Sequence, residues 1–170
     1  MKKTLCALQP TYIPWIPFFE RIYLSDIFVI LDDVEFSKNS NHNRNSIMSN
    51  SKKLMLTVPI YHKSHQLIKD VKIDNSKNWK KKHWISIKQS YEKLFFFKEI
   101  KKELEIIYSK NWIYLSELNI EIIKFLLRYL KIKKKIFISS EIKVEGTANE
   151  KLINLCKYFN TSSFIVKPGT

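Results

Sequence analysis

The sequence predicts an α/β fold built on a mainly parallel, Rossmann-like sheet, with a helical insertion at about residues 79–130. Short apolar segments alternate along the chain with segments of helical periodicity, an order typical of α/β domains. The segment "DIFVILDD" (26–33) is apolar without alternation, as expected of a strand buried on both faces of a parallel sheet. Polar residues gather where the apolar segments end. We therefore expect residues 1–170 to form a single α/β domain.

Five strands are expected in one largely parallel sheet, near residues 4–9, 27–32, 54–58, 135–139 and 163–167. After the first strand, residues 16–24 ("IPFFERIYL") can form a helix, because Pro17 suits a first turn, where its missing N–H is not needed. Within 79–130, apolar residues recur at spacings of three and four, which predicts a helix with one face in the core. They are Trp84, Ile87, Tyr91 and Leu94.

Turn signals and polar residues bound the later segments. "KLMLTVPI" (53–60) is expected as a strand ended by Pro59, and "KDVKID" (69–74) as a short edge strand. "KIFISSEI" (135–142) is a further strand, and "SSFIVKPGT" (162–170) is the last. The chain stops directly after that strand and its Pro-Gly turn. We therefore expect a C-terminal part to be missing and the exposed edge to favour association into oligomers.

The charge of the chain is strongly positive but comes from lysine. The net charge is +14, and only 3 of the 30 basic residues are arginines. Arginine is the residue suited to bidentate recognition of bases and phosphates, so the composition argues against a specific nucleic-acid partner. We interpret the lysines as a solvated surface produced largely by A/T-rich codons. Attraction to anionic ligands or to a membrane surface is the alternative.

The sequence gives no sign of a transmembrane segment. No apolar run approaches the roughly 20 residues that span a bilayer. The start "MKKTLCALQP" imitates a signal peptide, but Gln9 and Pro10 cut its apolar run short. Cys6 and Cys156 lie in apolar segments, as reduced core thiols do. These features predict a cytoplasmic protein.

Polar residues at the ends of the predicted strands point to a small-molecule site. Open α/β sheets bind ligands at the carboxyl ends of their strands. Asp32 and Asp33 end the second strand and can bind a ribose, an amine or Mg²⁺, or can simply cap a turn. Arg44 can clamp a carboxylate or phosphate, or can be a structural partner of Asp33 or Glu35. No cysteine or acidic partner has the spacing of a zinc site, so we assign no metal-ligating residue.

Six motifs in order carry a family resemblance. They are "LQPTYIPWIPFF", "DIFVILDDVEF", "NRN", "LTVPI", "ISSEI" and "EKLINLCKYFNTSSFIVKPG". In order and spacing the chain resembles the WbqC-like family over its whole length. It departs from the family pattern at Thr11, Pro17 and Lys167. The layout is also similar to that of the nucleotidyltransferase superfamily, although the H-x-G-H motif of that superfamily is missing.

The resemblance implies a role in bacterial surface-polysaccharide (O-antigen or capsule) synthesis, near amino-sugar pathways. One hypothesis is a transferase that moves an acyl, aminoacyl or nucleotidyl group onto an amino sugar or nucleotide sugar. Its cofactor is open, with a nucleotide or Mg²⁺ as candidates. The other hypothesis is a non-catalytic ligand-binding or scaffold partner in a polysaccharide-synthesis complex. Both hypotheses predict a small-molecule ligand.

The site residues follow from the strand-end loops and the family motifs. Asp33 and Glu141 are the acid/base or metal candidates. The predicted substrate-binding residues are Gln9, Tyr12, Trp15, Asp32, Asn43, Arg44, Asn45, Ser140 and Lys167. We expect Gln9, Tyr12, Asp33, Asn43, Arg44 and Glu141 to surround one cleft.

Overall fold

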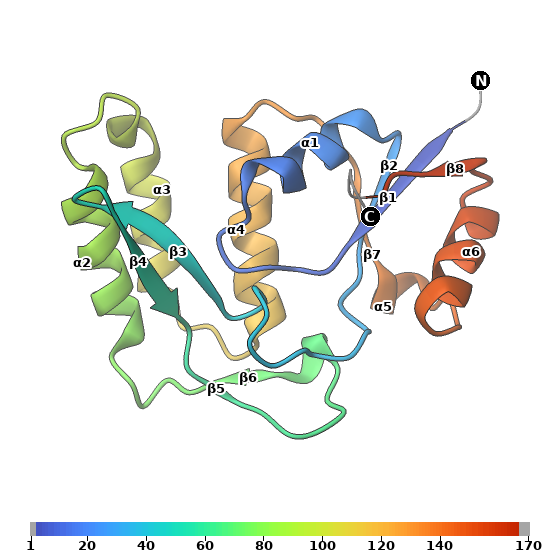
Figure 1. The fold of residues 1–170 in the computed structure, drawn as a ribbon, viewed down its shortest axis with the longest axis horizontal. Coiled ribbons are helices and arrows are strands. Elements are labelled where there is room, and N and C mark those ends of the chain that lie inside the picture. Colours follow the sequence, from blue (N-terminus) through green and yellow to red (C-terminus); the bar gives the residue numbers. More distant parts are fainter. Residues whose placement is uncertain (1–2, 167–170) are drawn as a thin grey trace.

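A four-stranded parallel sheet forms the centre of the fold. The computed structural model describes residues 3–166. The strands are β1 (Thr4–Leu8), β2 (Ile27–Ile30), β7 (Ile136–Ile138) and β8 (Ser163–Phe164), in the order β7-β2-β1-β8 (Figure 1). All three pairings are parallel. This confirms a mixed α/β fold and four of the five predicted sheet strands.

Helices cover both faces of this sheet (Figure 1). Helices α1 (Ile16–Leu24) and α4 (Leu115–Tyr129) pack on the face that carries Cys6, Leu8, Phe28 and Ile30. Helix α6 (Ala148–Tyr158) packs on the other face through Leu155, against Leu5, Ala7, Val29 and Leu31. Since both faces are buried, every position of β1 and β2 favours an apolar side chain. This explains the missing alternation in the sequence.

Three helices fill the predicted insertion. They are α2 (Trp79–Tyr91), α3 (Phe97–Ser109) and α4. With a β-hairpin they enclose a second apolar core, which includes Trp79, Ile87 and Phe125. The short elements are a 3-10 turn (Ile68–Asp70), the paired strands β5 (Ile60–Tyr61) and β6 (Lys72–Ile73), and the one-turn helix α5 (Ser139–Ile142).

The prediction that residues 54–58 join the parallel sheet is wrong. This segment belongs to β4 (Lys52–Thr57), which pairs antiparallel with β3 (Arg44–Ser49). The two strands are joined by Asn50 and Ser51, whose φ angles are 48° and 61°. Two successive residues with positive φ form the tight turn that matches the twist of a two-residue hairpin. The hairpin pairs locally and therefore needs no place in the central sheet.

No helix within residues 3–166 is both long and apolar enough to cross a membrane. The longest, α4, has 15 residues, against the roughly 20 that a bilayer requires.

Hydrogen bonds from distant segments fix the proline-containing turn (9–15) between β1 and α1. The fully buried amide of Asn119 on α4 donates to the carbonyl oxygens of Pro10 (3.1 Å) and His42 (2.8 Å). The amide of Asn45 donates to the carbonyl of Ile13 (2.8 Å), which has a φ of 47°. Positive φ is unfavourable for a β-branched residue, so this bond supports a strained position.

Buried hydroxyl and imidazole groups attach the same turn to the helical insertion. The hydroxyl of Tyr12 lies 2.8 Å from Nδ1 of His83 on α2 and 2.6 Å from the hydroxyl of Tyr108 on α3. All three side chains are buried. The turn is therefore held by α2, α3, α4 and β3 together, and its shape depends on the tertiary structure.

The first prediction concerns Asn119. Asn119→Ala leaves two buried carbonyl oxygens without their donor, which should lower the free energy of unfolding by about 2–4 kcal/mol. Urea unfolding followed by circular dichroism measures this change. Asn111→Ala, at an exposed position, is the matched control and should change stability little. Equal stability of the two variants would contradict the role given to Asn119.

The second prediction concerns acid stability. Burial lowers the pKa of both His42 and His83 to about 4. In the unfolded chain these groups take up protons below about pH 6.5, whereas the folded protein resists protonation until about pH 4. Their neutral state therefore favours folding above pH 6.5, and this stability is lost as the pH falls. As the pH falls through that window, protonation of each histidine in the unfolded chain should lower the free energy of unfolding by about 1.4 kcal/mol per pH unit.

Urea midpoints measured between about pH 7 and pH 4.5 test this slope. His83→Gln should show a shallower loss of stability than the unmodified protein over the same range, because one buried imidazole is gone. The same slope in both proteins would show that the carboxylates, and not His83, control the acid response.

Candidate functional site

A cleft of about 350 Å³ lies at the carboxyl end of β1, between β1 and β8. Its polar lining comes from Gln9, Thr11, Arg21, Asn41 and Asn45, and its apolar lining includes Trp15, Phe18, Leu31, Leu152 and Phe164. In chain order, β2 and then β7 are added on one side of β1, and β8 is added on the other side of β1. Ligands of open α/β sheets bind at such a reversal of strand order.

Contacts with a buried histidine orient Gln9 in the cleft. The backbone N–H of Ser37 donates to Nδ1 of His42 (3.3 Å). Nε2 of the neutral imidazole therefore carries the hydrogen and donates to Oε1 of Gln9 (2.9 Å). Gln9 itself is exposed. Its amide NH₂ group is thus held in one orientation and is available to donate to a ligand.

Two larger side chains complete the cleft. Trp15 is 50% exposed, so much of its ring is accessible. Arg21, one turn into α1, donates through Nε to the carbonyl of Pro17 (3.4 Å). Within residues 3–166 this is the one hydrogen bond of Arg21, which leaves its terminal nitrogens available for an anion or a hydroxyl. The cleft therefore offers amides, a hydroxyl, a guanidinium and an aromatic ring.

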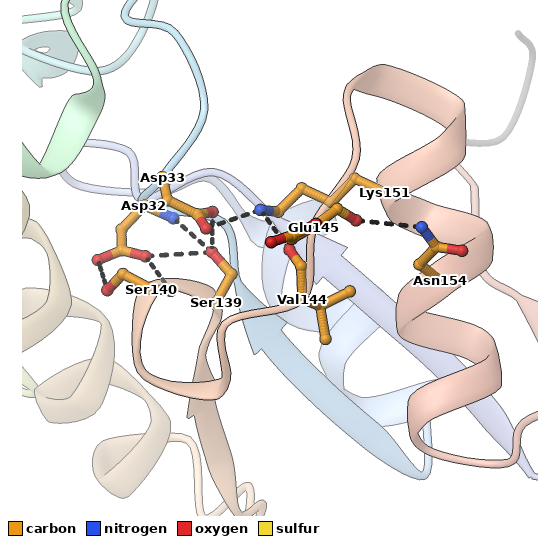
Figure 2. A network of polar contacts seen from close by, with 8 residues as sticks. All are labelled: Asp32, Asp33, Ser139, Ser140, Val144, Glu145, Lys151 and Asn154. Atoms are coloured by element: carbon orange, nitrogen blue, oxygen red, sulfur yellow. Dashed lines mark hydrogen bonds and ion pairs between the residues drawn. The ribbon is translucent and has the colours of Figure 1, made fainter.

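The two aspartates after β2 belong to a hydrogen-bonded network at the neighbouring strand ends (Figure 2). Asp32 is buried, and its carboxylate accepts from both the backbone N–H (3.0 Å) and the hydroxyl (2.7 Å) of Ser140, and lies 3.1 Å from the hydroxyl oxygen of Ser139. These bonds tie β2 to the first turn of α5. Asp32 and Ser140 therefore hold each other at this edge.

Asp33 forms a buried ion pair with a residue that the sequence did not indicate. Nζ of Lys151 on α6 lies 2.6 Å from the Asp33 carboxylate, and only 7% of the lysine side chain is exposed. Ser139 donates to the same carboxylate, and Lys151 also donates to the carbonyl of Val144 (Figure 2). A lysine within a helical segment resembles any surface lysine in sequence, so no local pattern could have identified this pair.

Arg44 and Asn43 line a different hollow, of about 360 Å³, with Lys38 and His62. Arg44 donates to the carbonyl of Asn39 (2.8 Å), and Asn43 to that of Val58 (2.9 Å). Neither alternative partner of Arg44 is used, because Asp33 pairs with Lys151, and Glu35 with His65.

The predicted residues thus occupy several places. Gln9, Trp15 and Asn45 meet in the cleft, Tyr12 is buried in the second core, and Glu141 is exposed on α5. Lys167 lies outside the described residues. Sequence reasoning missed Arg21 and Asn41 as lining residues. The scarcity of arginine was the available signal for Arg21, since the chain has only three.

No cluster of three or more histidine, cysteine or acidic side chains within residues 3–166 is arranged to hold a metal ion. The polar groups of the cleft are instead suited to hydrogen bonding with an uncharged or anionic organic ligand.

Comparisons with known proteins place the chain in a family. It is 31% identical over 170 residues to the uncharacterized protein Rv1507c of Mycobacterium tuberculosis, a match that covers 98% of this chain and 73% of the relative. No solved structure matches it significantly. The family model of the WbqC-like protein family matches residues 9–170, a span that includes the proline turn, the aspartate network and all the polar residues of the cleft. The chain belongs to the WbqC-like protein family.

Proposed function

We propose that the protein binds a sugar or nucleotide sugar in the cleft between β1 and β8, and that it acts in the synthesis of a bacterial surface polysaccharide or in amino-sugar modification. The observation that carries the proposal is the lining of the cleft. An accessible indole, the amide groups of Gln9 and Asn41, and the guanidinium of Arg21 face one hollow of about 350 Å³. We also propose that the protein acts in the cytoplasm.

Each component suits part of such a ligand. Amides donate and accept hydrogen bonds and so can match the hydroxyl and acetamido groups of a sugar. The face of Trp15 can stack on the apolar face of a sugar ring or on a base. Arg21 can bind a phosphate through two parallel hydrogen bonds.

The order of the parallel strands supports a nucleotide-type ligand. Taken in chain order, the four strands are arranged 3-2-1-4 across the sheet. This is the order of the first four strands of Rossmann-type sheets, which bind nucleotides at the carboxyl ends of strands 1 and 4. The turn after β1 contains prolines where the dinucleotide fingerprint has glycines, so the analogy extends to the position of the site and not to a phosphate loop.

For the reaction we propose transfer of an acyl, aminoacyl or nucleotidyl group to the bound sugar. Asp33, with its partner Lys151, is the preferred acid/base candidate because both residues are near the cleft in sequence. Leu31 and Leu152 line the cleft; Asp33 lies two positions after Leu31, and Lys151 lies directly before Leu152. Glu141 is the second candidate, on the adjacent α5. A nucleotide is the proposed cosubstrate, since the described residues offer no cluster of ligands for a Mg²⁺ ion.

A non-catalytic role is the second candidate, and one observation favours it. Among the described residues that line the cleft, none is a carboxylate or a histidine. Amides, a hydroxyl and a guanidinium recognise a ligand but do not exchange protons near neutral pH. A ligand-binding or scaffold partner in a polysaccharide-synthesis complex needs no more than this.

The third prediction tests the cleft. Nucleoside diphosphate sugars, the parent nucleoside diphosphates and free sugars are titrated separately in a calorimeter. Arg21→Ala should weaken binding of the phosphate-bearing ligands by about tenfold or more, and Trp15→Ala should weaken binding of all sugar ligands. Tyr23→Ala is the matched control, since Tyr23 is 67% exposed on the same helix as Arg21 and does not line the cleft. Binding that survives both cleft substitutions would refute the site.

The fourth prediction separates the enzyme from the binding partner. The protein is incubated with an activated acyl, aminoacyl or nucleotidyl donor and an amino sugar, and products are identified by mass spectrometry. If Asp33 acts as acid or base, Asp33→Asn should lower turnover by about a hundredfold while ligand affinity is retained. Urea unfolding of the same variant checks that the protein remains folded. Unchanged turnover in Asp33→Asn would remove Asp33 from the mechanism, and ligand binding without any product would favour the non-catalytic role.

A further inference from the structure

A second, apolar cavity of about 580 Å³ lies beside the cleft, enclosed by the turn after β1, the β3 strand and helices α2, α3 and α4. Its volume is in the range of cavities that hold small organic ligands. Its inner wall includes the buried residues Ile47, Ile87, Phe97, Ile122 and Phe125. Among the described residues that line it, none carries a formal charge.

Most polar atoms on its wall already have partners within the protein. The hydroxyl of Tyr108 pairs with that of Tyr12, and the hydroxyl of Tyr91 accepts from the backbone N–H of Met48 (3.0 Å). The amide of Asn45 donates to the carbonyl of Ile13, and its Oδ1 accepts from the backbone N–H of Ser46 (2.8 Å). A polar occupant would leave its own hydrogen-bonding groups largely unsatisfied there, which is unfavourable.

We propose that this cavity binds the hydrocarbon chain of an amphipathic ligand. Pro14, Trp15 and Asn45 line both the cavity and the cleft, so the two hollows share one wall. A ligand that crosses this wall can place a polar group against Gln9 and Arg21 and its chain between the helices. The position of the polar group rests on the proposed function, whereas the hydrocarbon site does not.

The rim of the cavity indicates where the hydrocarbon chain of a ligand would enter. Leu94 and Phe96, in the turn between α2 and α3, line the cavity and are 54% and 64% exposed, and Phe95 between them is 74% exposed. Lys93 precedes Leu94, Phe95 and Phe96 in the sequence, and Lys98 follows them. The turn lies at the end of the insertion, away from β7 and β8 (Figure 1). The chain can therefore come from a free acyl compound in solution or from an anionic lipid surface, since exposed aromatic and lysine side chains suit that interface.

The fifth prediction tests the hydrocarbon site by calorimetric titration of octanoate, decanoate and dodecanoate below their micellar concentrations. One molecule should bind per chain, and each added methylene should tighten binding about fourfold. Ile100→Trp fills the cavity and should weaken decanoate binding by about tenfold or more. Leu94→Asp, at the exposed rim, should weaken it as well and provides a second variant if Ile100→Trp fails to fold. Leu130→Trp, 47% exposed and outside the cavity, is the matched control and should bind like the unmodified protein.

Further measurements distinguish the two possible sources of the hydrocarbon chain, and they test the cavity and the cleft separately. If the protein co-sediments with phosphatidylcholine vesicles that contain phosphatidylglycerol, and Phe95→Ser does not, the hydrocarbon chain comes from a lipid surface. If the protein binds fatty acids but not vesicles, the hydrocarbon chain comes from a free acyl compound. Arg21→Ala should keep the roughly fourfold gain in affinity per methylene across the fatty-acid series even where it loses nucleotide sugars, so the two proposals fail separately. Affinity that is independent of chain length, equal binding by Ile100→Trp and Leu130→Trp, or a stable dimer that binds no fatty acid would each overturn the inference.

Discussion

Two hydrogen bonds from the buried amide of Asn119 connect the helical insertion to the residues around the cleft. They join α4 to the carbonyl oxygens of Pro10 and His42, which lie 32 positions apart in the chain. His42 in turn orients Gln9 in the cleft. Asn119 uses both hydrogens of its NH₂ group for these bonds, and its own Oδ1 has no hydrogen-bond partner among the described residues.

The proline-containing turn acts as a rigid partition between two chemically different hollows. On one side lie the amides and the guanidinium of the cleft, and on the other lie the aliphatic and aromatic side chains of the second core. Prolines restrict the backbone of the turn, and Asn45 and Tyr12 anchor it to β3 and to the helical insertion. A flexible, glycine-rich turn would not keep these two environments apart.

The acidic residues at the sheet edge have a structural task whatever else they do. Asp32 accepts two hydrogen bonds from Ser140 of α5, and Asp33 neutralises the buried Lys151 of α6. Removing one member of a buried ion pair leaves an uncompensated charge, which is strongly destabilising. The polar lining of the cleft, at the carboxyl end of β1, instead comes from neutral side chains and from Arg21.

The sequence by itself determined the local elements of this protein. The helix at 16–24, the helical character of residues 79–130 and four parallel strands follow from periodicity, prolines and apolar runs, all of which act between residues a few positions apart. It also placed Gln9, Trp15 and Asn45 at the edge where the cleft forms. Only the tertiary structure decided the hairpin partner of residues 52–57, the separation of Arg44 from Gln9, and the pairing of Asp33 with Lys151. Asp33 and Lys151 are 118 positions apart, and such contacts are created when distant elements pack together, so no local pattern records them.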